Sequence, residues 1–198
     1  MKKAISIAAA LGLLMALSLN ATAAPKPQIE DPLGDSNFVN DQGTGDGTFG
    51  DQTQADAGTV SDITAVTIWN NKKTLYMRVD TEAAPPAATG IGYRVRVNPD
   101  DTGSYCLTFE VYHPGANNAL TTPVGYFRDL CEGGDPVPIK ILGTQWEIPR
   151  SASKAFAKGS KLTAPQAQAF LYSGNETAGA TYPVADTTKV GKDFAFKK

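Results

Sequence analysis

Acidic side chains crowd one segment near the start of the chain. Seven aspartates lie from Asp31 to Asp62, and no lysine or arginine occurs between Lys26 and Lys72. Carboxylates this close together repel one another unless water or a hard cation screens them. Calcium suits such a segment, because it takes roughly six to eight oxygen ligands. The segment therefore predicts a calcium site. The alternative is that its aspartates cap turns through their own backbone and keep the chain soluble.

Three of these aspartates are the expected ligands. Asp31, Asp35 and Asp62 could bind the cation together with loop carbonyl oxygens and with Asn37 or Asn40. Glycines among them allow the backbone to turn its carbonyl oxygens inward. The segment does not match the EF-hand pattern, so a different ligand arrangement is expected.

Aromatic residues offer a second kind of chemistry. Trp69, Tyr76, Tyr112 and Tyr126 are the candidate ligand-binding residues. Aromatic rings that are exposed together on one sheet face can stack on sugar rings, whereas buried rings form the core. We expect Trp146 to be buried, because the chain has few large aliphatic residues.

Catalytic groupings are largely missing. His113 is the single histidine, and no motif marks a serine partner for a Ser-His-Asp triad. The sequence contains no H-E-x-x-H, no G-x-S-x-G and no glycine-rich phosphate loop.

Glu110 and Glu147 would serve glycoside hydrolysis only if they faced each other across a cleft. Met77 and His113 would have to supply any haem ligands, and Met77 is expected in the core. We therefore expect that the protein is not an enzyme.

The first 23 residues have the pattern of a secretory signal peptide. Lys2 and Lys3 precede an apolar stretch from Ala4 to Leu19, and small residues follow at Ala21 to Ala23. The apolar stretch is shorter than the ~20 residues that a membrane-spanning helix needs. We expect cleavage of residues 1–23, or one residue later, and a secreted chain with no membrane insertion afterwards.

The charge of the exported chain argues against nucleic acid as a partner. Loss of Lys2 and Lys3 leaves 16 basic residues against 20 acidic residues, a net charge of −4. Nucleic-acid binding needs a basic patch, and none is evident. The 175 residues that remain fit a single domain.

The chain has two cysteines, Cys106 and Cys131. In an exported chain an even number predicts a disulfide, and the alternative is two separate buried thiols. A bridge closing a loop of this length contributes roughly 3–4 kcal/mol to stability. It would also leave neither sulfur free to act as a nucleophile.

Short alternating runs predict an all-β fold. In residues 74–81, for example, Leu75, Met77 and Val79 alternate with polar residues. Residues 24–30 would be a flexible lead. Residues 31–198 would form one antiparallel β-sandwich, of jelly-roll or immunoglobulin-like type, with a long acidic N-terminal loop and at most one short helix. The expected strands are 62–69, 74–81, 91–98, 105–112, 124–131, 137–142, 145–149, 161–173 and an edge strand within 182–196, and the expected helix is 151–158, opened by Ser151.

The N-terminal edge of this pattern resembles a known group of domains. The run Asp31-Pro32-x-Gly34-Asp35, then an irregular loop, then Asp62 at the start of a strand is similar to DOMON-like sandwiches. Family 9 carbohydrate-binding modules and the calcium-binding domain of glucodextranase-type enzymes are similar in the same way. The resemblance implies calcium ligation by Asp31, Asp35 and Asp62. The end of the chain resembles the last strand of these domains, which adds Asp186 as a candidate ligand. The cysteine pair and the loop SNFVNDQGTGDGTFG depart from the pattern, so the resemblance implies the fold more than the ligand.

These observations lead us to expect a secreted, calcium-stabilised, non-catalytic binding module for carbohydrate or a cell-surface component. Two alternatives stay open. One is an extracellular hydrolase, or a hydrolase accessory domain, acting on glycans. The other is a structural envelope or matrix protein. Tryptophan and tyrosine exposed together on one face would favour carbohydrate binding, and two glutamates facing across a cleft would favour the hydrolase.

Overall fold

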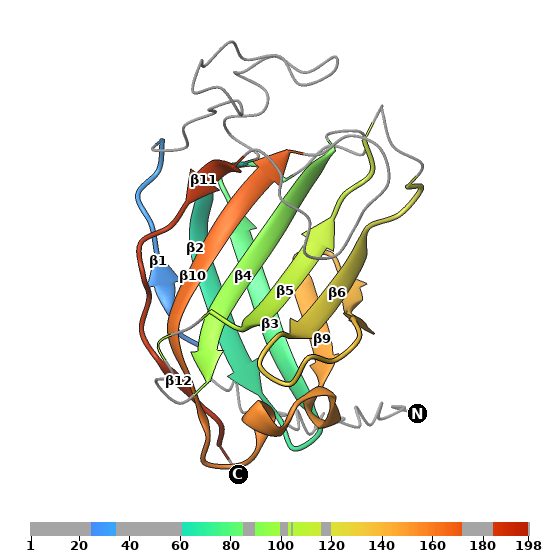
Figure 1. The fold of residues 1–198 in the computed structure, drawn as a ribbon. Coiled ribbons are helices and arrows are strands. Elements are labelled where there is room, and N and C mark those ends of the chain that lie inside the picture. Colours follow the sequence, from blue (N-terminus) through green and yellow to red (C-terminus); the bar gives the residue numbers. More distant parts are fainter. Residues whose placement is uncertain are drawn as a thin grey trace, which may run out of the picture.

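Two antiparallel β-sheets pack face to face (Figure 1). The computed structural model describes residues 25–34, 61–84, 90–99, 103, 105–115, 120–171 and 184–197. The first sheet has the strand order β1-β2-β3-β9-β8. The second has the order β11-β10-β4-β5-β6-β7, with β12 paired to β10. This arrangement confirms the expected all-β antiparallel sandwich.

Strand boundaries follow the alternating runs of the sequence. The strands expected at 62–69 and 74–81 form the hairpin β2–β3, and those expected at 91–98 and 105–112 form the hairpin β4–β5. In chain order the strands are β1 (Ile29–Glu30), β2 (Ile63–Asn70), β3 (Thr74–Thr81), β4 (Ile91–Pro99), β5 (Leu107–Tyr112), β6 (Val124–Asp129), β7 (Val137–Pro138), β8 (Lys140–Leu142), β9 (Gln145–Pro149), β10 (Lys161–Leu171), β11 (Val184–Thr187) and β12 (Phe194–Ala195).

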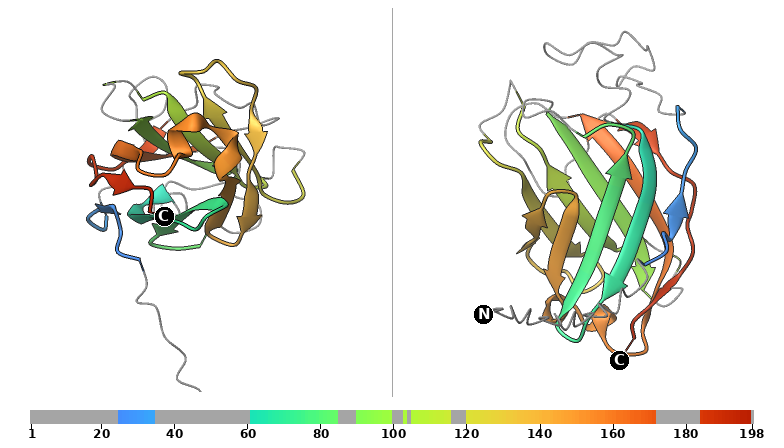
Figure 2. Two further views of the ribbon diagram at one scale, coloured as in Figure 1. Left: turned by 90° about the horizontal axis from the view of Figure 1, so that it is seen from below. Right: turned by 180° about the vertical axis from the view of Figure 1, so that it is seen from behind.

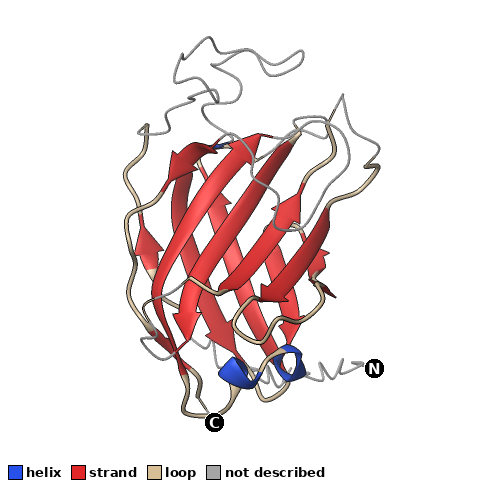
Figure 3. Ribbon diagram, viewed as in Figure 1, coloured by secondary structure: helices blue, strands red, loops and turns tan. Residues whose placement is uncertain are grey.

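The helix expected at 151–158 is instead two 3₁₀ turns, η1 (Arg150–Ala152) and η2 (Lys154–Phe156). Ser153, rather than Ser151, caps the second turn, because its hydroxyl accepts a hydrogen bond from the Ala155 amide at 3.0 Å. Figure 3 shows how little helix the described residues contain. None of the helices there is long and apolar enough to cross a membrane.

The core lies between the sheets and is built by alternation. Inward residues of β3 are buried, and the outward residues between them are partly exposed. Trp146 on β9 is 2 % exposed, which confirms its expected burial. Phe156 from η2 packs its ring against Phe109 and Phe127, with ring centroids 6.1 and 5.0 Å away. The short 3₁₀ segment thus closes the core at one end of the sandwich.

The lead into the sandwich is more ordered than expected. Ile29 is fully buried and pairs with Val66 of β2, so the prediction of a flexible lead is wrong for Ile29–Glu30. The Gln28 amide donates to the Val66 carbonyl at 2.9 Å, and the Lys192 amide donates to the Gln28 carbonyl at 2.8 Å. Figure 2 shows β1 and the C-terminal segment running together beside β2. An apolar side chain next to an open strand edge explains the pairing.

Cys106 and Cys131 form the predicted disulfide, with Cα atoms 5.3 Å apart. Cys106 lies just before β5 and Cys131 just after β6. The bond therefore ties the turn after β6 to the neighbouring strand of the same sheet. The Leu130 amide also donates to the Cys106 carbonyl at 2.7 Å.

Candidate functional site

Three of the predicted acidic ligands lie on segments that contact one another. The Gly34 amide donates to Asp62 at 2.5 Å, and the Ile63 amide donates to Asp186 at 2.8 Å. The Lys189 amide donates to Asp31 at a longer 3.4 Å. Each carboxylate thus accepts a hydrogen bond from a backbone N–H of another of these three segments. Together they link the lead, the start of β2 and the end of β11.

Asp62 has the least ordinary surroundings of the three. Its side chain is 1 % exposed, and its second carboxylate oxygen, Oδ1, is buried without a hydrogen-bond partner among the described residues. Burying a carboxylate oxygen in this way costs free energy unless something compensates it. A bound cation could supply this compensation, because carboxylate oxygens are calcium ligands.

The described residues do not form a complete calcium cage. No three acidic, histidine or cysteine residues among them come close enough to hold a metal ion. Asp35 lies outside the described residues. The structure therefore brings Asp31, Asp62 and Asp186 to one edge of the sandwich without gathering their carboxylates around a single point.

Trp69 and Tyr76 form an aromatic pair on the outer face of the first sheet. They are cross-strand partners, with ring centroids 5.3 Å apart and planes 10° from parallel. Both side chains are partly exposed. Asn71 holds the far end of the pair, because its amide donates to the Tyr76 hydroxyl at 2.8 Å. The Asn71 side chain also accepts from the Lys73 and Thr74 amides at 2.8 Å, which fixes it in the turn between β2 and β3.

A groove of about 980 Å³ runs beside this aromatic pair. Trp69 lines it at the edge of β2, between the lead and the C-terminal segment. Most of the other lining side chains are polar and can donate or accept hydrogen bonds. They are Lys26, Gln28, Asn70, Asn71, Asp193 and Lys197.

The other two aromatic candidates lie on the opposite sheet. Tyr112 on β5 is fully buried, so its ring cannot serve as an exposed platform. Its hydroxyl donates to Glu110 at 3.1 Å, and its ring meets that of Tyr126 edge-on at 6.5 Å. Tyr126 on β6 is partly exposed. The four candidates therefore do not share one face, and only Trp69 and Tyr76 lie together on an accessible one.

The glutamates considered for hydrolysis point away from each other. Glu110 lies on the outer face of the second sheet, fully buried and paired with Arg94 at 2.5 Å. Glu147 lies on the outer face of the first sheet, where it pairs with Lys140 at 3.2 Å. With the sandwich core between them, these two carboxyl groups cannot act across one cleft.

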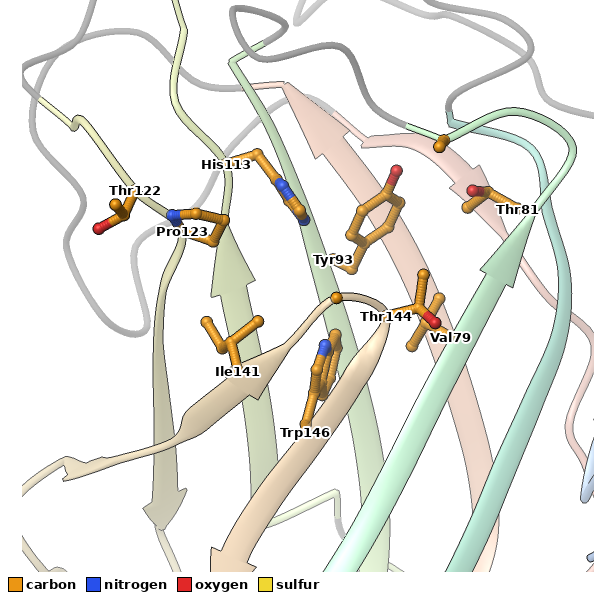
Figure 4. A pocket seen from close by; sticks show the side chains of 11 residues that line it. Val79, Thr81, Tyr93, His113, Thr122, Pro123, Ile141, Thr144 and Trp146 are labelled. Carbon is orange, nitrogen blue, oxygen red and sulfur yellow. The ribbon is translucent and has the colours of Figure 1, made fainter.

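Between the sheets, at the end where β3 stops, lies a cavity of about 500 Å³ (Figure 4). The first sheet contributes Val79 and Thr81 from β3, and Trp146 from β9. Tyr93 from β4 and His113, just after β5, face them from the second sheet. The remaining lining residues come from the loops and from β8, and they are Ala84, Thr122, Pro123, Ile141, Gly143 and Thr144.

Burial changes the acid–base behaviour of the two ring systems in this cavity. It lowers the pKa of His113 from 6.5 to about 4, so the imidazole is neutral at neutral pH. Burial also raises the pKa of Tyr93, and a hydrogen bond to the Thr81 side chain partly offsets this. The rings meet edge to face, with centroids 5.6 Å apart.

The sequence did not single out this cavity. In the sequence, His113 stands before Pro114 and Gly115 at the end of an expected strand, and Tyr93 occupies one inward position of an alternating run, so neither residue predicts the cavity. A tyrosine at an inward position is a usable signal, because its hydroxyl must find a polar partner inside the sandwich. Met77 lies in the core and is not among the described residues that line the cavity, so it does not join His113 there.

The chain matches no protein-family model, and comparisons with curated proteins and with solved structures gave no match either. The functional argument therefore depends on the chain's own residues.

Proposed function

We propose that this protein is a secreted, non-catalytic binding module for carbohydrate, with Trp69 as the main contact. The observation that carries the proposal is the position of Trp69, which forms part of the wall of the groove, among several polar side chains, and is backed by the Tyr76 ring. Sugars present both apolar C–H faces and many hydroxyl groups. An aromatic ring among amide and carboxylate groups is complementary to both.

The groove offers suitable hydrogen-bonding groups at fixed positions. Asn70 is anchored to the C-terminal segment, since its side chain accepts from the Lys197 amide at 3.3 Å. Asn71 is anchored in its turn and to Tyr76. Side chains that are already held in place lose less conformational entropy when a ligand binds. This arrangement supports recognition of a flexible polysaccharide better than it supports catalysis.

Calcium stabilisation is the second part of the proposal. The buried Asp62 oxygen supports it, together with the link from the Asp62 carboxylate to the Gly34 amide. A bound cation would compensate the carboxylate charge and hold the lead against β2. In this role calcium stabilises the folded module and takes no part in chemistry.

A glycan array probed with the mature protein, with and without calcium, tests the carbohydrate claim. We expect a restricted set of polysaccharides to bind, and Trp69→Ala to weaken the affinity for the best of them by about tenfold or more. Tyr126→Ala is the matched control, because it removes a partly exposed aromatic ring from the other sheet. Binding that Trp69→Ala leaves unchanged would contradict the proposal, as would an array without any hit.

A further inference from the structure

The cavity at the other end of the sandwich differs from the groove in charge, because the groove is lined by Lys26, Asp193 and Lys197. Its walls are formed largely by apolar groups, among them Val79, Ile141 and Trp146, and no charged side chain is among its described lining residues. Hydroxyl groups of Thr81 and Thr144 and the imidazole of His113 interrupt these walls. Apolar walls with a few polar groups are typical of small-molecule sites.

The size of the cavity suits a small ligand. The cavity is partly open to solvent at the end of the sandwich, so a ligand could enter it from outside. Here about 500 Å³ remains beside large inward side chains, within the roughly 300–1,000 Å³ usual for small-molecule sites.

The lining limits what the cavity can accept. A charged ligand would bury its charge without an opposite partner, which is costly in apolar surroundings. The neutral imidazole of His113 carries both a hydrogen-bond donor and an acceptor. Polar groups in the wall, such as the Thr144 hydroxyl, make one hydroxyl, carbonyl or amine group on the ligand acceptable, and the rest of the ligand must be apolar.

We propose that this cavity is a second, independent site for a small, neutral, mostly apolar molecule with one hydrogen-bonding group. Its apolar part lies against Trp146 and Ile141, and its polar group lies near a polar group of the wall such as the Thr144 hydroxyl. The site is separate from the carbohydrate groove. The groove is next to Asn70, where β2 ends, and the cavity is next to Thr81, where the antiparallel neighbour β3 ends.

The two tryptophans of the chain make the sites separately observable, because Trp69 lines the groove and Trp146 lines the cavity. In the variant Trp69→Phe, only Trp146 fluoresces as tryptophan. The neutral fluorescent probe N-phenyl-1-naphthylamine is titrated into this variant, with excitation of the tryptophan. We expect saturable probe emission at one probe per chain, with matching quenching of Trp146.

Two substitutions in the Trp69→Phe background locate the probe. Ile141→Phe enlarges a side chain that lines the cavity, and we expect it to weaken probe binding by about tenfold. Leu142→Phe makes the same enlargement at the next residue, which is 49 % exposed and on the outer face, and should leave binding unchanged. Unfolding curves confirm that both variants are folded.

The inference is overturned if the probe gives no energy transfer from Trp146, or if Ile141→Phe and Leu142→Phe bind it equally well. The carbohydrate proposal is unaffected by either outcome, because the probe experiment is done without Trp69. Conversely, failure of the glycan array leaves the cavity experiment valid.

Discussion

The charge state and hydrogen bonding of single side chains in this sandwich depend on how deeply each is buried. His113 looks like an ordinary turn residue in the sequence, yet burial in the cavity wall lowers its pKa and keeps it neutral. Asp62 looks like one aspartate among many, yet it is 1 % exposed and one of its carboxylate oxygens has no hydrogen-bond partner among the described residues. The residue types alone could suggest calcium or a turn. Which carboxylate becomes buried depends on the packing of segments that are far apart in the sequence.

His113 should make stability depend on pH. Its pKa is about 4 in the folded chain and 6.5 when it is unperturbed. Between these values the unfolded chain binds the proton more strongly, so the free energy of unfolding falls as the pH is lowered from 6.5 towards 4. We expect this one group to account for a loss on the order of 2 kcal/mol.

The variant His113→Gln isolates that contribution from the titration of carboxylates. Glutamine carries no charge at any pH, so urea unfolding of the variant should lose about 2 kcal/mol less between pH 6.5 and pH 4 than the parent does. Tyr93, the titratable ring that meets His113, stays neutral over this range because its pKa is raised. Parallel pH profiles for the two proteins would show that His113 is not protonated in the way described.

At the scale of elements, the lead and the C-terminal segment depend on each other. The Lys192 amide donates to Gln28, and the Gly191 amide donates to the Pro165 carbonyl at 2.7 Å. A β-carbon added at Gly191 would lie 2.5 Å from the Gln28 carbonyl oxygen and from the Ile29 side chain. No real contact is that short, so the close approach requires glycine.

Gly191→Ala should therefore loosen β1. We expect a loss of about 1–3 kcal/mol in the free energy of unfolding, because the backbone of the lead must shift. Amide hydrogen exchange at Ile29 should speed up, since that amide lies in the segment that moves. Gly134→Ala is the control, because a β-carbon there meets nothing within 4 Å. Equal stabilities for the two variants would mean that the lead is not held by this contact.

The disulfide acts at the same scale. The bond joins two cysteines 25 residues apart in the sequence, and the loop that it closes contains the whole of β6. Replacing both Cys106 and Cys131 with alanine should lower the free energy of unfolding by about 3 kcal/mol, since the unfolded chain regains that loop's freedom. Urea unfolding measures the difference. A loss below about 1 kcal/mol would mean that strand pairing, and not the disulfide, stabilises this edge of the sheet.

At the scale of the whole molecule, the sequence predicted the architecture well. Alternation in residues 74–81 and 91–98 marks inward faces without any knowledge of partners, so the hairpins and the sandwich could be foreseen. Which sheet each hairpin joins is a long-range property. That is why Tyr112 was grouped with Trp69 although it lies on the other sheet. The cavity was missed for the same reason, because its walls come from both sheets.

Calcium should stabilise the whole sandwich if it binds at the edge where Asp31, Asp62 and Asp186 lie. We expect a higher melting temperature with excess calcium than with a chelator, because a ligand that binds only the folded state adds about 2.7 kcal/mol at a hundred times its Kd. Asp62→Asn should abolish the difference, whereas Asp135→Asn, at an exposed acid elsewhere, should not. Equal melting temperatures with calcium and with chelator would remove calcium from the account.

Carbohydrate binding at the Trp69 end is the central claim, and two single-tryptophan variants test it most directly. Each is titrated with the polysaccharide that the array selects, and its tryptophan emission is recorded. We predict a saturable change in Trp146→Phe, where Trp69 remains, and no change in Trp69→Phe, where Trp146 remains. A response from Trp146 alone, or from neither tryptophan, would contradict the claim.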